Sequence, residues 1–253
     1  MARKSRIAPP RRPSANLIAT LAIVVLAVAV IGGVLLFNRS DDTGDNGNSG
    51  NGGGAPATIP AELRAGPDSN TLTKAADGKV TVVEFLDYQC PACAAYYANV
   101  TKKLEADYAD KITFVTRDFP LSIHPLARQA AQAAEAAAVQ GKYREMYHQL
   151  YDNYEQWAVA PGGQEVSDDA ARATEFFDTY ATAIGLDLDR FHTDMASAAV
   201  KQRIDADVAA GEKLGVTSTP TIFVNGAKFE PQGDTFGDVD SQLRDKIDEA
   251  LGR

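Results

Sequence analysis

The sequence predicts an α/β domain that carries a helical insertion and is preceded by a single membrane-spanning segment. Three observations predict this fold class. A strand that is apolar on both faces leads directly into a helix, an Asn-Gly turn joins two later strands, and a long helical region separates these two halves. Residues 61–253 are enough for one domain with a sizeable core.

The N-terminal region has the pattern of an uncleaved membrane anchor. Residues 17–37 contain no charge and no proline and are long enough to cross a bilayer as one helix. Residues 1–16 carry five basic side chains and no acidic one, so they are expected to form a cytoplasmic tail while the rest is exported. A cleaved signal peptide is the alternative, but its only small-residue site, Ala27-Val28-Ala29, is followed by eight more apolar residues. No cysteine lies near this segment, which excludes a lipidated N-terminus.

Residues 38–60 are expected to form a flexible linker. They are mainly Gly, Asn, Asp and Ser and have little apolar surface to bury, so folding cannot offset the entropy of ordering them. Such a linker holds the domain of residues 61–253 off the membrane and keeps it near membrane partners.

The exported part of the chain is strongly acidic. Beyond residue 39 there are 19 basic and 34 acidic residues, a net charge of −15. This excess argues against nucleic acid or anionic lipid headgroups as ligands. We interpret it as a contribution to solubility.

Both cysteines of the chain lie at the predicted start of a helix. Residues 79–86, KVTVVEFL, are rich in β-branched residues and mostly apolar on both faces, which is typical of a buried central strand. Pro91 follows Cys90, and proline is favoured at the first helical position because its missing N–H is not needed there. Cys93 lies one turn later on the same face, so the two sulfurs are close enough to form a disulfide.

A cysteine at a helix N-terminus is expected to have an acidic thiol. The free N–H groups and the helix dipole favour a negative charge there, and in such motifs the thiol pKa falls from ~8.5 to roughly 3.5–7.5. A stabilised thiolate favours the reduced form and makes the disulfide more oxidising. We therefore expect Cys90 to be the attacking or attacked sulfur and the more buried Cys93 to be the resolving sulfur.

The Cys-x-x-Cys spacing also occurs in zinc sites and in structural disulfides. A structural zinc site needs about four protein ligands, whereas the chain has no third cysteine and its three histidines are scattered singly. A structural disulfide that closes so short a loop removes little chain entropy. The strand-to-helix turn of an exported protein therefore favours redox chemistry, with no metal and no cofactor.

The C-terminal region completes the pattern. Two short predicted strands, TIFV and AKFE, flank Asn225-Gly226, Thr219-Pro220 precedes them, and a final helix follows in DVDSQLRDKIDEALG. VVEFLDYQCPAC, RDFPLSIHPLARQAAQAAEAA and GVTSTPTIFVNG occur in this order. With these motifs, the chain from about residue 75 to 253 resembles the DsbA-like thiol:disulfide oxidoreductases of bacterial envelopes, which have the thioredoxin fold.

The resemblance implies roles for further residues. Pro220 is expected to be a cis proline facing the disulfide, with the Thr219 backbone offering strand-like hydrogen bonds to a substrate; a proline at the start of an edge strand is the alternative. Glu84 is a carboxylate inside a buried strand, and by resemblance to the family it is expected to relay protons to the resolving thiol. The alternative role for Glu84 is an ion pair with a nearby lysine. The helical region of about residues 120–215 is expected to form the family's insertion, a cap beside the disulfide.

Other polar and aromatic residues are expected to be structural. His124-Pro125 matches a helix-start feature of the family, so a capping or packing role is expected rather than a catalytic base. Tyr88 and Gln89 are expected to shape the surface around the disulfide. Four aromatic residues near helical spacing are expected in the core or in a groove wall: Tyr143, Tyr147, Tyr151 and Trp157.

These observations predict a membrane-tethered, extracytoplasmic enzyme that introduces disulfide bonds into exported proteins. The expected partners are unfolded or reduced exported proteins and, by resemblance alone, a membrane redox partner of the DsbB or vitamin K epoxide reductase type. A reductase, for example in cytochrome c maturation, would use the same cysteines in reverse. An isomerase usually needs a dimerisation module, which nothing before residue 61 supplies. A peptide-binding protein with a vestigial disulfide is the third alternative.

Overall fold

The computed structural model describes residues 59–253, apart from residues 65, 67 and 68. The predicted cytoplasmic tail, the apolar segment of residues 17–37 and most of the predicted linker lie outside the described residues. Among the residues that are described, no helix combines the length and the apolar character needed to span a bilayer. Ile59, near the end of the expected linker, is fully buried, and its N–H donates to the carbonyl of Gly226 at 2.8 Å.

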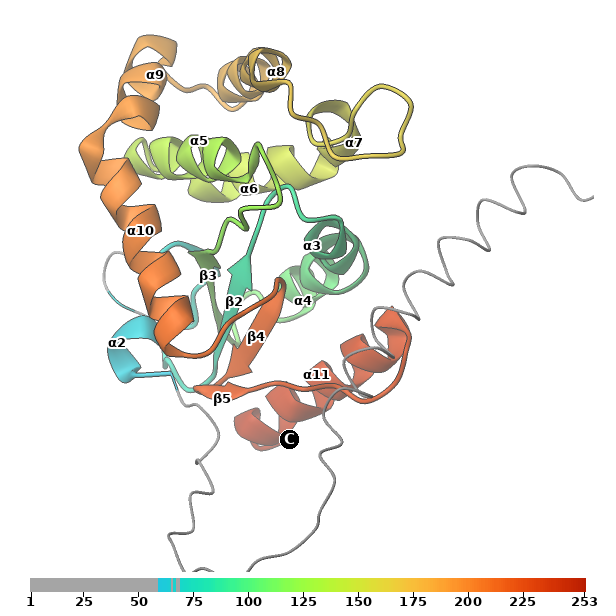
Figure 1. Ribbon diagram of the computed structural model, residues 1–253. Coiled ribbons are helices and arrows are strands. Elements are labelled where there is room, and N and C mark those ends of the chain that lie inside the picture. Colours follow the sequence, from blue (N-terminus) through green and yellow to red (C-terminus); the bar gives the residue numbers. More distant parts are fainter. Residues whose placement is uncertain (1–58, 65, 67–68) are drawn as a thin grey trace, which may run out of the picture. The chain divides into compact units, whose positions relative to one another are not determined.

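A mixed sheet with the strand order β1-β3-β2-β4-β5 lies at the centre of the domain (Figure 1). Its strands are β1 (Thr71–Thr73), β2 (Thr81–Leu86), β3 (Thr113–Asp118), β4 (Thr221–Val224) and β5 (Ala227–Lys228). β2 pairs in parallel with β3 and antiparallel with β4, while β1 and β5 form antiparallel edges. Every residue of β2 is buried, which confirms the predicted central strand.

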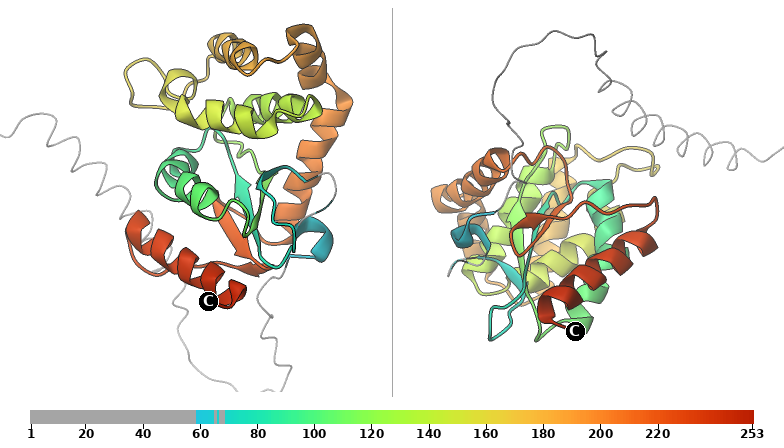
Figure 2. Two further views of the ribbon diagram at one scale, coloured as in Figure 1. Left: turned by 180° about the vertical axis from the view of Figure 1, so that it is seen from behind. Right: turned by 90° about the horizontal axis from the view of Figure 1, so that it is seen from below.

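Helices cover both faces of this sheet. Figures 1 and 2 show α3, α4 and α11 on one side and α2 and α10 on the other, with α5 to α9 beyond the end of the sheet where β2 runs into α3. The helices are α2 (Ala61–Arg64), α3 (Pro91–Tyr96), α4 (Lys102–Asp107), α5 (Ala127–Val139), α6 (Tyr143–Asp152), α7 (Tyr154–Trp157), α8 (Ala170–Ala183), α9 (Leu188–Ala196), α10 (Ala198–Lys213) and α11 (Phe236–Leu251). The region expected to be a helical insertion therefore consists of α5 to α10.

Alternate residues of β2 contribute to two separate apolar cores. Val82 and Leu86 belong to the larger core, which includes residues of α3, α4, α11 and the insertion. Val83 and Phe85 belong to a smaller core on the opposite face. Since side chains alternate along a strand, Glu84 shares the face of Val82 and Leu86 and projects into the larger core.

The predicted hairpin is present but shorter than expected. Asn225 and Gly226 have φ values of 48° and 89°, the left-handed conformations that a two-residue turn of this type needs. Pairing extends only to Ala227 and Lys228, so the stretch AKFE forms a two-residue strand. The predicted final helix is confirmed as α11.

Candidate redox site

Cys90 occupies the junction between β2 and α3. It is the N-cap of α3, with extended backbone angles of φ −69° and ψ 121°, and Pro91 opens the helix as predicted. The helical path continues through a π-helical segment, η1 (Tyr97–Thr101), into α4. Cys90 retains 6% exposure whereas Cys93 is fully buried, and both are free thiols. The sulfur of Cys90 is therefore the one that a substrate can reach.

The two thiols differ sharply in acidity. Hydrogen bonding to Cys93 lowers the pKa of Cys90 from 9.0 to about 6, against the opposing effect of burial, with smaller contributions from Thr219 and the backbone of Cys93 and Ala92. Burial, together with the neighbouring Cys90, raises the pKa of Cys93 well above its ordinary value. The sequence predicted an acidic Cys90, but it attributed this to the helix N–H groups, whose contribution is smaller than that of the Cys93 thiol.

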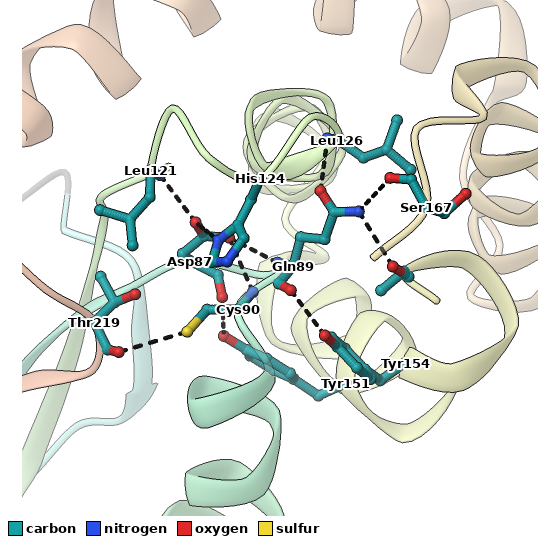
Figure 3. Close-up of polar contacts among 11 residues, drawn as sticks. Asp87, Gln89, Cys90, Leu121, His124, Leu126, Tyr151, Tyr154, Ser167 and Thr219 are labelled. Carbon is teal, nitrogen blue, oxygen red and sulfur yellow. Dashed lines mark hydrogen bonds and ion pairs between the residues drawn. The ribbon is translucent and has the colours of Figure 1, made fainter. Parts of the chain in front are cut away.

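The loop before β4 brings Thr219 and Pro220 to the cysteines. The Thr219–Pro220 peptide bond is cis, as the resemblance implies. The Cys90 thiol donates to the carbonyl oxygen of Thr219 at 3.5 Å (Figure 3). The backbone of Thr219 thus lies directly against the exposed sulfur.

A largely apolar groove lies beside Pro220. Its lining includes Tyr96, Ile222, Phe229, Pro231 and Val239. Two charged residues of the lining, Lys228 and Glu230, form an ion pair at 3.1 Å. A groove of this kind next to a strand suits the side chains of an extended peptide.

Glu84 is buried beneath the helix that carries the cysteines. Its Oε2 accepts a hydrogen bond from the Thr101 hydroxyl at 3.4 Å, and no ion pair with a lysine forms among the described residues. Burial raises the pKa of Glu84 to about 8, with Thr101 opposing the rise. The charge of Glu84 also helps to raise the pKa of Cys93. Glu84 is therefore mostly protonated at neutral pH and lies close enough to Cys93 to influence its titration.

The turn between β2 and α3 is buried, which corrects the expectation that Tyr88 and Gln89 shape the surface. Tyr88 is 1% exposed and Gln89 is fully buried. The Gln89 amide donates to the carbonyl groups of Ala158 and Ser167 and accepts from the N–H of Leu126 (Figure 3). Gln89 therefore fastens the turn to two segments of the insertion, because a buried amide needs partners for its hydrogen bonds.

Sequence reasoning missed a contact between Asp87 and His124. No side chain caps the start of α5, and His124 instead points to Asp87, with Nδ1 2.6 Å from Oδ2 (Figure 3). The available signal was an acidic residue placed in the turn directly before the cysteine. The four aromatic residues named above are all buried, as predicted.

The fold and the paired cysteines define a thiol-disulfide oxidoreductase of the DsbA-like type within the thioredoxin superfamily. A family model described as thioredoxin matches residues 74–243, and the chain therefore belongs to that family.

Solved structures agree with this classification. BdbD from Bacillus subtilis, in its oxidised form, superposes with a TM-score of 0.61 at 22% identity, over 79% of this chain and 99% of that one, which supports the fold. A thioredoxin-like oxidoreductase from Silicibacter pomeroyi is 29% identical, with a TM-score of 0.55, over 74% of this chain and 94% of that one. The thiol-disulfide exchange protein α-DsbA2 from Wolbachia pipientis is 25% identical, with a TM-score of 0.57, over 74% and 90% of the two chains.

Curated relatives include much longer proteins. Na⁺/H⁺ antiporter NhaA 1 of Mycolicibacterium vanbaalenii is 33% identical over 167 residues, which are 65% of this chain and 24% of the antiporter. Na⁺/H⁺ antiporter NhaA 3 of Salinispora tropica is 35% identical over 177 residues, or 70% of this chain and 24% of the antiporter. The chain thus spans about a quarter of the length of the curated relatives it matches.

Proposed function

We propose that the protein is an extracytoplasmic oxidase that introduces disulfide bonds into exported proteins, with Cys90 and Cys93 as its reacting sulfurs. The observation that carries this proposal is the contrast between the two thiols. Cys90 is the N-cap of α3, is the more accessible thiol and has a lowered pKa, whereas Cys93 is fully buried and has a raised pKa. A stable Cys90 thiolate favours the dithiol form, so the disulfide tends to take electrons from a substrate.

The reaction consists of two exchanges. A substrate thiolate attacks Sγ of Cys90 in the enzyme disulfide, which forms a mixed disulfide and releases Cys93 as a thiolate. A second substrate thiolate then attacks the substrate sulfur of that mixed disulfide and displaces the Cys90 thiolate. Two electrons pass from the substrate to the enzyme, and the substrate leaves with a new disulfide.

Glu84 supplies the proton that the first exchange needs. Cys93 leaves as a thiolate in a buried site, where a charge is costly. Glu84, with its pKa raised to about 8, holds a proton at neutral pH and can give it to Cys93. The resulting carboxylate accepts the proton again when Cys93 must be deprotonated for reoxidation.

Substrates bind through the backbone of Thr219 and the groove beside Pro220. The Thr219 carbonyl lies against Cys90, so an extended chain can align there as an additional strand. An extended binding mode suits unfolded or reduced exported proteins. The strong acidity of the exported part makes nucleic acid a poor ligand. The chemistry needs no cofactor or metal, and the ion transport named for the antiporter relatives is not transferred from a quarter-length match.

The basic tail and the apolar segment of residues 17–37 support anchoring in the cell membrane with the domain outside the cytoplasm. The reduced enzyme then passes its two electrons to a membrane protein of the DsbB or vitamin K epoxide reductase type, as family resemblance suggests.

Equilibration of the purified domain with glutathione tests the direction of the reaction. An oxidase is expected to have a potential nearer to about −120 mV than to about −270 mV, the values of strong oxidants and of thioredoxin respectively. A value at or below about −270 mV would overturn the proposal and favour a reductase. Refolding of a scrambled-disulfide substrate, in the absence of net oxidation, would favour an isomerase. Failure to oxidise a dithiol peptide at all would favour a binding protein with a vestigial disulfide.

A further inference from the structure

A buried acid and a histidine meet directly behind the reactive cysteine. Asp87 is the first residue of the turn that leads to Cys90, and His124 lies in the segment that leads into α5. Nδ1 of His124 is 2.6 Å from Oδ2 of Asp87, and the two side chains are 9% and 0% exposed. Figure 3 shows this pair beside the backbone of Cys90.

The Asp87 carboxylate also organises the backbone around it. Oδ1 accepts the N–H groups of Gln89 at 2.8 Å and Cys90 at 3.2 Å, and Oδ2 accepts the N–H of Leu121 at 2.9 Å. One side chain therefore joins the cysteine-bearing turn to the start of the insertion. An ionised carboxylate can only accept hydrogen bonds, so Nδ1 of His124 is the donor in this pair.

The position of the Asp87 carboxylate affects the charge that the Cys90 sulfur can carry. Burial raises the pKa of Asp87, and the hydrogen bond from His124 is the largest opposing influence. A negative charge so close to the Cys90 backbone disfavours a second negative charge on the Cys90 sulfur. The His124 N–H offsets part of that charge.

We propose that Asp87 and His124 are a positioning pair, in which Asp87 holds the backbone of Cys90 and His124 screens the Asp87 charge from the Cys90 thiolate. His124 then sets how oxidising the disulfide is through Asp87, while the Cys90 sulfur itself is hydrogen-bonded to Thr219. This inference deepens the proposed function and depends on Cys90 being the reactive thiol.

Other titratable groups face the same turn. Cys93 and Glu84 approach from α3 and β2, and both remain mostly neutral at pH 7 because their pKa values are raised. The hydroxyls of Tyr151 and Tyr154 donate to the carbonyl groups of Asp87 and Gln89 from α6 and α7. Burial raises the pKa of both tyrosines, so they carry no charge near pH 7.

Substitution of His124 by leucine tests the screening. The variant His124→Leu removes the imidazole donor and leaves the Asp87 carboxylate with only its backbone N–H donors. We expect the Cys90 pKa, followed by thiolate absorbance, to rise by about one unit, a tenfold change. At pH 7 the equilibrium with glutathione should shift about fivefold toward the disulfide, equivalent to a potential about 20 mV more negative.

The double variant Asp87→Asn/His124→Leu separates charge from structure. It removes both members of the pair, while asparagine keeps an acceptor for the backbone N–H groups. The acid dissociation constant of Cys90 and the equilibrium constant with glutathione should therefore return to within about threefold of the wild-type values. His192→Leu is the matched control, since His192 makes a similar contact with Asp178 at 2.7 Å in α8 and α9. This control should leave the Cys90 pKa unchanged.

The inference is wrong if His124→Leu leaves the Cys90 pKa unchanged, or if the double variant shows the same shift as the single one. Should His124→Leu fail to fold, Asp87→Asn alone decides the matter, because its Cys90 pKa must be at or below the wild-type value. These outcomes compare variants with one another. They therefore remain informative even if the wild-type potential identifies a reductase.

Discussion

The acidity of Cys90 makes the stability of the reduced domain depend on pH in a way that the oxidised domain cannot share. The Cys90 pKa is lowered from 9.0 to about 6 in the folded state, so the folded dithiol gains stability as the pH rises above 6. The gain is lost as the pH falls through that value. From these pKa values it is at most on the order of 1 kcal/mol at pH 7 and 3 kcal/mol at pH 8, and it is near zero at pH 5. Cys90 lies at the edge of the core, and solvent screening reduces the expected gain to about half of these values.

Denaturant unfolding of both redox forms between pH 5 and 8 measures this gain. The free energy of unfolding of the reduced form minus that of the oxidised form should rise across the range. Loop closure by the disulfide adds an offset to this difference but not a slope, because chain entropy does not depend on pH. Measurements stop at pH 8 because the Cys93 thiol of the unfolded chain begins to ionise near pH 9.

The variant Cys90→Ala provides the control. It lacks the titrating thiol, so its stability should not show the rise that separates reduced wild type from oxidised wild type. A difference that stays flat from pH 6 to 8, or an equal rise in Cys90→Ala, would refute the acidic Cys90 thiol on which the oxidase proposal depends.

Three further predictions concern the other parts of the mechanism and the topology. Cys93→Ala should accumulate mixed disulfides with substrates through Cys90, whereas Cys90→Ala should trap few or none, and equal trapping on non-reducing gels would contradict the assignment of roles. Glu84→Gln should stabilise the fold by about 3 kcal/mol at pH 7 and have little effect near pH 4, because the raised pKa of Glu84 costs stability as the pH rises from about 4.5 to 8. The same variant should slow the reduction of the disulfide by a thiol substrate about tenfold, as rapid alkylation would show; unchanged stability and rate would remove Glu84 from the mechanism. A reporter fused after residue 60 should be active only if it functions outside the cytoplasm, and a secreted protein that begins after Ala29 would contradict the anchor.

Much of the fold was predictable because local rules and tertiary structure agree. The apolar run that forms β2, the Cys90-Pro91 helix start and the Asn225-Gly226 turn each carry a local signal. The edge strand β1 was not predicted, because three residues paired through an irregular register leave almost no pattern in the sequence. Its strand conformation depends on pairing with β3.

The candidate site also contains residues that local sequence predicts and contacts that only tertiary packing creates. The positions of Cys90, Cys93 and Pro220 follow from adjacent residues or from a family motif. The contact between Asp87 and His124 joins residues 37 positions apart and exists only because the insertion packs against the turn. Polar side chains in turns usually face solvent, so the sequence favoured an exposed Gln89, whereas the structure buries it among backbone groups of the insertion.

The hydrogen bond between Ile59 and Gly226 determines where the chain enters the domain. Gly226 follows Asn225, whose N–H donates to the carbonyl of Thr81 at the start of β2, while Cys90 lies beyond the other end of that strand. A strand of six residues rises about 20 Å, so the attachment point and the reactive sulfur are at opposite ends of the sheet. In the proposed membrane-anchored protein, the chain would therefore join the domain at the end of the sheet opposite Cys90. Reoxidation by the proposed membrane partner would then require the end of the sheet that carries Cys90, not the end that carries Ile59, to approach the bilayer.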